Sequence, residues 1–174
     1  VAATFTYDTL SSFDDGVFCF ILLSSSMLFV YYRFMCNFIQ NSLIMLKIGD
    51  KMPYFEVVDQ DGNKVVSDDL LGKKTVVYFY PKDNTSGCTA EACSIRDSYD
   101  AFIARGYNVV GVSKDSANSH KKFKTKYDLP FTLLSDTSTQ MLQAFGAWGE
   151  KKMYGKTVMG TLRRTFIFDE NGIL

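Results

Sequence analysis

The order of apolar and polar positions predicts strands and helices in turn over the later part of the chain. Residues 75–80 form a continuous apolar run, which is typical of a central strand covered on both faces. Residues 91–105 instead repeat their apolar positions at helical spacing, and Gly106 stands where a C-cap glycine would end that helix. A second apolar strand is predicted over residues 109–113.

Shorter elements are predicted around these segments. The Asp61-Gly62 pair between two apolar runs indicates a hairpin. Because strands alternate with helices from residue 75 onward, we expect an α/β fold with a mixed β-sheet and flanking crossover helices. The remaining elements are predicted as strands over 55–58 and 64–67, a turn over 68–72, a helix from Asn118 or Ser119 through 127, a strand over 131–134, a helix over 137–145, a loop over 146–156 and a strand over 161–169 before an Asn171-Gly172 turn.

Composition and charge exclude several classes of protein. The 174 residues suit one domain with a full core, and 19 basic residues balance 19 acidic ones, so no charge excess favours nucleic acid. The 4 cysteines have neither the density of a secreted disulfide scaffold nor the spacing of a zinc site, and there is no Gly-rich phosphate loop. We therefore expect no metal, no cofactor and no nucleic-acid partner. The single histidine, His120, stands among lysines on a helix face that we expect to be solvated, so we assign it no catalytic role.

The most informative stretch is the loop that joins the strand at 75–80 to the following helix. It consists of turn-forming residues and ends near Cys88, where the helix is predicted to begin. Backbone N–H groups at a helix start are unpaired, so an anion such as a thiolate is stabilised there. The flanking Gly87 and the loop-to-helix position are unlike the surroundings of a core cysteine. We therefore predict that Cys88 is a reactive thiolate and not a buried, inert cysteine.

A second cysteine, Cys93, follows five residues later in the same predicted helix. At helical rise and radius the two Cα atoms would be roughly 8.7 Å apart, whereas a disulfide requires less than about 7 Å. The pair therefore cannot form a disulfide while the helix is intact, which suggests a redox cycle coupled to local unfolding. The alternative is a helical cysteine that faces the core and has no redox role.

These residues resemble the active-site pattern of the peroxiredoxins. Pro81, Thr85 and Cys88 match P-x-x-x-T-x-x-C, and the continuation to Cys93 is similar to the bacterioferritin-comigratory, or Q-type, branch. Weaker matches follow in the expected order, so the resemblance covers residues 45–174. It implies a thioredoxin-like fold and a thiol-dependent peroxidase that reduces hydrogen peroxide and alkyl hydroperoxides. It also implies thioredoxin as the reductant, a monomer, and a cytoplasmic role in antioxidant defence and redox homeostasis.

The same resemblance implies a role for each residue of the loop and helix. Cys88 would be the peroxidatic cysteine, which is oxidised to a sulfenic acid, and Cys93 would resolve that acid as an intramolecular disulfide. If Cys93 has no redox role, an external thiol would resolve Cys88 instead. Thr85 would turn its hydroxyl toward the thiolate or the peroxide, although threonine is also a common helix N-cap. Pro81 would close the preceding strand and shield the thiolate.

A catalytic arginine is implied at Arg163, three residues before Phe166 in the last predicted strand. Its guanidinium would stabilise the thiolate and the charge that develops on the peroxide oxygen. Arg164 competes for this role, but adjacent strand residues face opposite ways, so only one of the two arginines can reach the site. For both, a solvated surface charge is the simpler alternative.

Two other functions compete with the peroxidase. A thioredoxin-like disulfide oxidoreductase would carry C-x-x-C, which is absent because four residues separate Cys88 and Cys93. A non-catalytic module for binding or redox sensing would have the same fold but would need neither Thr85 nor Arg163. The presence of both residues favours the peroxidase.

Residues 1–44 form an apolar extension that differs from the peroxiredoxin domain expected over 45–174. No charge occurs from 17 to 32, a run shorter than the roughly 20 residues of a spanning helix, and acidic residues precede it instead of the basic start of a secretory signal. Two interpretations stay open. The extension is either an upstream or mis-started segment before a natural beginning near Met45, or a genuine anchor, the one case in which we expect contact with a membrane. Because the Asn171-Gly172 turn lies so near the end, we expect the domain to be truncated there.

Overall fold

A computed structural model of the chain describes residues 45–153 and 155–174, and the predictions about residues 1–44 lie outside this range. The described elements are β1 (Glu56–Asp59), β2 (Lys64–Val66), the 3-10 helix η1 (Ser67–Leu70), β3 (Lys74–Phe79), α2 (Ser86–Asp97), α3 (Tyr99–Ala104), β4 (Tyr107–Ser113), α4 (Ala117–Tyr127), β5 (Thr132–Ser135), α5 (Gln140–Ala144), β6 (Trp148–Met153), β7 (Lys156–Thr161) and β8 (Arg164–Phe168). None of the helices in these ranges is long and apolar enough to cross a membrane.

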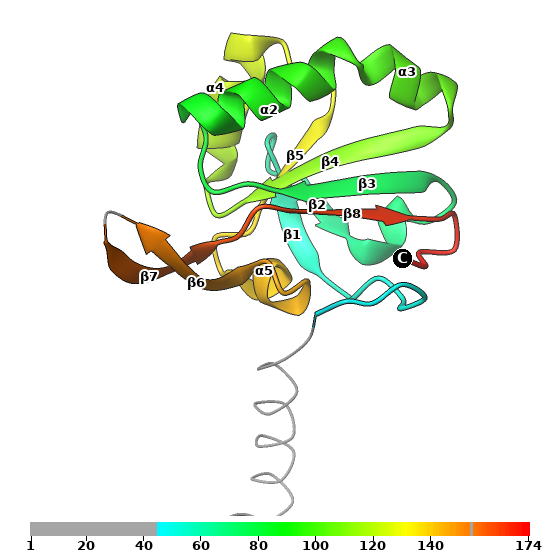
Figure 1. Cartoon of the computed structure of the whole chain (residues 1–174). Helices are drawn as coiled ribbons and strands as arrows, with labels where there is room; N and C mark the ends of the chain where they lie inside the picture. The colour runs from blue at the N-terminus through cyan, green and yellow to red at the C-terminus, as the bar shows by residue number, and fades with distance from the viewer. Residues whose placement is uncertain (1–44, 154) are drawn as a thin grey trace, which may run out of the picture. The chain divides into compact units, whose positions relative to one another are not determined.

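Six of the described strands form one sheet in the order β2-β1-β5-β4-β3-β8 (Figure 1). The three strands β3, β4 and β5 run parallel to one another, as strands joined by crossover helices do. The strands β1 and β8 flank this parallel centre in antiparallel pairing, and β2 pairs with β1 in a hairpin. The mixed sheet expected from the sequence is therefore confirmed.

Helices cover both faces of this sheet, with α2, α3 and α4 on one face and α5 on the other (Figure 1). The side chains of β3 alternate between the two cores that result. Val77 and Phe79 belong to the core that includes α5, whereas Val76 and Tyr78 belong to the core that includes α2 and α4. Because both of its faces are buried, β3 is apolar from Val76 to Phe79, after Lys74 and Thr75 at its start.

The predicted helix over 91–105 is two helices in the structure. It begins earlier, at Ser86, and Ser98 separates α2 from α3. The helix α4 also begins earlier than predicted, because Ser116 is its N-cap and accepts a hydrogen bond from the backbone N–H of Ser119. Competing serines near a helix start offer several possible caps, and only the backbone conformation selects one.

The prediction of a loop over 146–156 is wrong, because β6 and the start of β7 lie in this segment and the two strands form a hairpin. These two strands pair only with each other, so most of their positions stay exposed and leave no alternation of apolar and polar residues to detect. The predicted strand over 161–169 is likewise divided. Thr161 ends β7 and Arg164 begins β8, so Leu162 and Arg163 lie between the strands.

The prediction that His120 lies on a solvated helix face is also wrong. Its side chain is 0% exposed, and it lies on the same buried face of α4 as Phe123, three residues later. The neighbouring Lys121 and Lys122 are exposed, and their charge suggested a solvated face for the whole segment. A helix presents adjacent residues about 100° apart, so charged neighbours say little about the direction of one side chain.

Candidate active site

The loop that carries the predicted nucleophile leaves the sheet at the carboxyl end of β3. The backbone N–H of Tyr80 donates to Val112, which keeps the chain beside β4 for one residue more. The loop then turns through Asn84, whose φ of 58 is left-handed, and α2 begins after its N-cap Thr85. Cys88 is thus the third residue of α2, within the turn whose backbone N–H groups have no helical partner.

The thiol of Cys88 is buried, which differs from the expectation that its surroundings are unlike those of a core cysteine. Its exposed fraction is 1%, and it packs in the apolar cluster with Tyr78, Tyr80 and Ala92. Its sulfur, however, has a cationic neighbour, because Nη2 of Arg163 lies 3.1 Å from Sγ. A guanidinium in this position stabilises a sulfur anion by a charge-assisted hydrogen bond. The arrangement is therefore suited to a reactive thiolate as well as to packing.

Sheet register brings Arg163 to Cys88 although 75 residues separate them. Arg164 lies opposite Phe79 in the antiparallel pair of β8 and β3, so Arg163 falls where β3 ends and the Cys88 loop begins. Arg163 is not itself in a strand, so strand alternation is not what separates the two arginines. The arginine that contacts the sulfur is nevertheless Arg163, the residue that the resemblance to the peroxiredoxins implied. Its catalytic role stays a prediction.

A carboxylate that the sequence analysis overlooked holds the other side of this guanidinium. Nη1 of Arg163 donates to Oε2 of Glu91, which lies one helical turn after Cys88. Residues three apart lie on the same face of a helix, so the spacing of Cys88 and Glu91 in the sequence could have indicated that Glu91 lies near the sulfur. Glu91 orients the planar fork of the guanidinium toward the sulfur. Because its own charge is paired with Arg163, Glu91 opposes a thiolate less than a free carboxylate would.

Gly87 makes room for the guanidinium beside the sulfur. A Cβ atom built at this position would lie 3.2 Å from Nη2 of Arg163, closer than ordinary van der Waals contact. The missing side chain of Gly87 is thus part of the site, not only a feature of the loop.

Replacing Gly87 with alanine is expected to lower reactivity toward peroxide while leaving the fold intact. The added methyl group displaces the guanidinium from Cys88, and we expect the rate constant for oxidation by hydrogen peroxide to fall about threefold to tenfold. Alanine favours helix by roughly 0.5–1 kcal/mol, so the melting temperature should not fall. Stopped-flow oxidation and a melting curve of the same sample measure both. An unchanged rate constant would contradict this role of Gly87.

Two other predicted site residues lie in the loop, Pro81 and Thr85. The hydroxyl of Thr85 donates to the backbone carbonyl of Lys82 at 3.2 Å and makes no side-chain cap, although Thr85 occupies the N-cap position. Its oxygen retains capacity to accept a further hydrogen bond. Pro81 is half-buried and directly follows Tyr80. The roles proposed for these two residues stay predictions.

Cys93 is half-buried in α2 and carries a free thiol, as does Cys88. The helix is continuous between the two cysteines, so the roughly 8.7 Å separation of their Cα atoms expected from helical geometry applies. Of the 12 residues of α2, the buried ones are Cys88 and Ala92. Little apolar surface therefore holds the first turns of α2 to the core, which is typical of segments that open locally.

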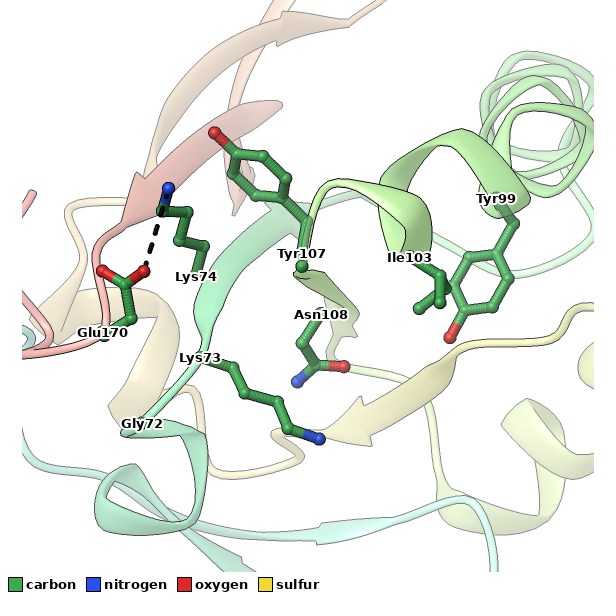
Figure 2. Close-up of a pocket in the computed structure, with 9 residues that line it drawn as sticks. Gly72, Lys73, Lys74, Tyr99, Ile103, Tyr107, Asn108 and Glu170 are labelled. Atoms are coloured by element: carbon green, nitrogen blue, oxygen red, sulfur yellow. Dashed lines mark ion pairs between the residues drawn. The ribbon is translucent and has the colours of Figure 1, made fainter.

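A separate hollow of about 460 Å³ lies at the opposite end of β3 (Figure 2). It is lined by Lys73, just before β3, by Lys74 at the start of β3, and by Tyr107 and Asn108 at the start of β4. Strand rise places this end roughly 20 Å from the loop that carries Cys88. The hollow therefore takes no part in chemistry at the sulfur. Among the described residues, no group of three or more His, Cys, Asp or Glu side chains is placed to hold a metal ion.

Comparison with known proteins gives the family and the fold of this chain. The model of the AhpC/TSA family matches residues 48–174. Peroxiredoxin Bcp of Bacillus subtilis (strain 168) is 46% identical over 129 residues, which are 74% of this chain and 82% of the relative. A mutant of PrxQ from Xylella fastidiosa has a structure with TM-score 0.70 at 30% identity, covering 75% of this chain and 84% of that one. The bacterioferritin comigratory protein of Xanthomonas campestris, described for its alkyl peroxide reduction activity, has TM-score 0.65 at 35% identity over 68% of this chain and 76% of that one. The expected thioredoxin-like fold is confirmed.

Proposed function

Because this chain belongs to the AhpC/TSA family and is a thiol peroxidase of the peroxiredoxin type, we propose that Cys88 is the residue that reacts with the peroxide. Its thiolate attacks the terminal oxygen of a hydroperoxide, and the O–O bond breaks. The sulfur takes up that oxygen as a sulfenic acid, and the leaving oxygen takes a proton and departs as water or an alcohol. The single observation that carries this proposal is the contact between the Arg163 guanidinium and Cys88 Sγ at 3.1 Å.

The surrounding residues stabilise the negative charge, which shifts from the sulfur to the departing oxygen during this step. Arg163 stabilises the thiolate before reaction and the negative charge that grows on the departing oxygen during it. Thr85 lies at the entrance of α2 with an oxygen able to accept a hydrogen bond from the peroxide. Pro81, which has no backbone N–H to donate, limits access of water to the sulfur. No metal or organic cofactor is required, since the oxidant is the substrate and the electrons come from the thiolate.

Cys93 then resolves the sulfenic acid. Its thiolate attacks the Cys88 sulfur, the hydroxyl leaves as water after gaining a proton, and an intramolecular disulfide results. The two Cα atoms must approach from roughly 8.7 Å to less than about 7 Å, so the first turns of α2 must unwind. The small buried surface of α2 keeps the cost of that unwinding low.

Recycling of the disulfide needs an external dithiol, and we assign thioredoxin to this step on the pattern of the family. The substrates are hydrogen peroxide and alkyl hydroperoxides, of which the second class is the one named for the Xanthomonas campestris relative. We further propose that the enzyme acts as a monomer in the cytoplasm, in antioxidant defence and redox homeostasis.

Intact mass after one equivalent of hydrogen peroxide tests the proposed cycle. We expect a fast loss of two hydrogens and a linked peptide that contains Cys88 and Cys93. If Cys88 oxidises while Cys93 stays free, the enzyme uses one cysteine and an external thiol. If Cys88 of the folded protein does not react with dilute peroxide, the assignment of Cys88 is wrong.

A further inference from the structure

A buried polar cluster lies beneath the loop that carries Thr85 and Cys88, and the peroxidase chemistry above makes no use of it. Its centre is Asp83, in the loop, and His120, on α4. The exposed fractions of their side chains are 2% and 0%. Buried ionisable groups are costly unless they are paired and hydrogen-bonded, so such a cluster at a functional loop requires an explanation.

Each polar atom of the Asp83 carboxylate has a partner. Nδ1 of His120 lies 2.9 Å from Oδ2, and the hydroxyl of Ser119 donates to the same oxygen at 2.7 Å. The hydroxyl of Tyr80 donates to Oδ1 at 2.8 Å. Burial alone would raise the pKa of Asp83. The hydrogen bond and charge of His120, together with the hydrogen bonds from the hydroxyls of Ser119 and Tyr80, hold that pKa below its ordinary value. The carboxylate is therefore ionised and tightly held.

The imidazole of His120 has a hydrogen-bond partner at each of its two nitrogens. Nε2 lies 3.1 Å from the backbone carbonyl of Leu134, which only accepts, so Nε2 carries a hydrogen. Nδ1 faces the Asp83 carboxylate, which when ionised also only accepts. The hydrogen-bonded pair of Asp83 and His120 thus links the loop to the strand β5.

The Ser, His and Asp side chains do not form a hydrolase triad. In such a triad the serine hydroxyl is hydrogen-bonded to the imidazole, which takes its proton. Here the hydroxyl of Ser119 donates to Asp83, and His120 has no exposed surface from which to reach a substrate. The cluster is therefore a support and not a second catalytic centre.

The backbone of Asp83 is held as firmly as its side chain. Its N–H donates to Oδ2 of Asp115 at 2.8 Å, and the hydroxyl of Ser113 donates to the same oxygen at 2.8 Å. The loop is thus tied at one residue to the end of β4 and to α4. Asn84 follows directly in the left-handed conformation, and the N-cap Thr85 comes next. The direction in which α2 starts is set from this fixed point.

We propose that Asp83 and His120 are positioning residues for the peroxidase reaction. Their buried hydrogen-bonded pair holds the stem of the loop so that Thr85 and Cys88 meet the peroxide and the Arg163 guanidinium in a reactive geometry. A displacement on the order of 1 Å at reacting atoms can lower a rate about 100-fold. Asp83 lies three residues before the start of α2, so a small shift of its backbone would displace Cys88 and lower the rate of oxidation. The inference rests on the proposed function, because it assumes that Cys88 is the reacting residue.

The test compares oxidation and alkylation of Cys88 in Asp83→Asn, His120→Gln and the double variant. Oxidation by hydrogen peroxide needs the correct geometry of Thr85, Cys88 and Arg163, whereas alkylation by iodoacetamide reports only the availability of the thiolate. Both rates are measured on reduced protein that is folded by circular dichroism. Phe123→Leu is the matched control, since Phe123 is also fully buried on α4 and packs against Tyr80, and an aromatic ring makes no hydrogen bond to the Asp83 carboxylate.

We expect each single variant to lower the oxidation rate constant at least about tenfold while alkylation changes less than about threefold. The double variant should be no slower than the slower single variant, because the two residues act as one unit. Phe123→Leu should lower the melting temperature and leave the oxidation rate of the folded protein unchanged. A general loosening would instead expose the buried thiol and raise alkylation, and that result overturns the proposal.

Ser119→Ala provides a milder variant in case the buried substitutions prevent folding. Ser119 is only half-buried, and its loss removes one of the hydrogen bonds to Asp83, so a smaller fall in oxidation rate of about threefold is expected. Folded variants that react with peroxide at the wild-type rate overturn the positioning role. If Cys88 of the wild type itself fails to react with peroxide, the proposed function is wrong. If the wild type and the variants react at equal rates, only the positioning role is wrong.

Discussion

Replacing Arg163 with glutamine is expected to lower the rate constant for oxidation of Cys88 by hydrogen peroxide about 100-fold or more, because removing one preorganised donor from a charge-developing centre has this effect in enzymes. The guanidinium lies 3.1 Å from the sulfur and is the cation that contacts it. Glutamine keeps a hydrogen-bond donor but not the charge. Lysine would restore the charge without the planar fork that also meets Glu91, so Arg163→Lys should be intermediate. Stopped-flow fluorescence or competition with a second peroxidase measures the rate constant.

Arg164→Gln is the matched control for this prediction. Arg164 is adjacent in sequence and has the same charge, but it begins β8 opposite Phe79. We expect its substitution to leave the rate constant within about twofold of wild type, as for other substitutions away from the reacting atoms. Equal losses in the two variants would indicate a general electrostatic effect, and a larger loss in Arg164→Gln would move the catalytic role to that residue.

Cys93→Ser is expected to separate the two halves of the cycle. The first oxidation of Cys88 should continue at nearly the wild-type rate, because Cys93 takes no part in attack on the peroxide. The product should then be a sulfenic acid that is trapped by dimedone, and turnover with thioredoxin should fall about tenfold or more because no disulfide forms for exchange. Mass spectrometry of the labelled peptide and a coupled thioredoxin assay measure these outcomes.

Hydrogen exchange tests the unwinding that the disulfide requires. Oxidised wild type should lose amide protection over the first turns of α2, while β3 and β4 stay protected. Oxidised Cys93→Ser should keep the protection of the reduced protein, since no bond then draws the two residues together. Cys36→Ser, which changes a cysteine outside the described residues, should behave as wild type. A disulfide formed without loss of protection in α2 would contradict the coupling between resolution and local unfolding.

The sequence was sufficient where the determining signal lies within a few neighbouring residues. The apolar run of β3 predicted a strand covered on both faces, and alternating strands and helices predicted the mixed sheet. The loop before α2 and the five-residue spacing of Cys88 and Cys93 are also local, so the predictions of a reactive thiolate at a helix start and of unwinding before a disulfide forms needed no distant residue. A few neighbouring residues determine turns and helix starts, because the hydrogen bonds and backbone preferences that form them act between residues close in sequence.

The tertiary structure alone decided which distant residues meet. Phe79 lies opposite Arg164, and this register places Arg163 beside Cys88, where Glu91 orients it and Gly87 makes room. His120 faces inward, where its partner is Asp83 in the loop before α2, 37 residues earlier in the chain, and no local pattern indicates that partner. Periodicity records which face of an element is buried, but it does not record what lies against that face. That depends on the order and register of strands in the sheet, and these are set by packing over the whole domain.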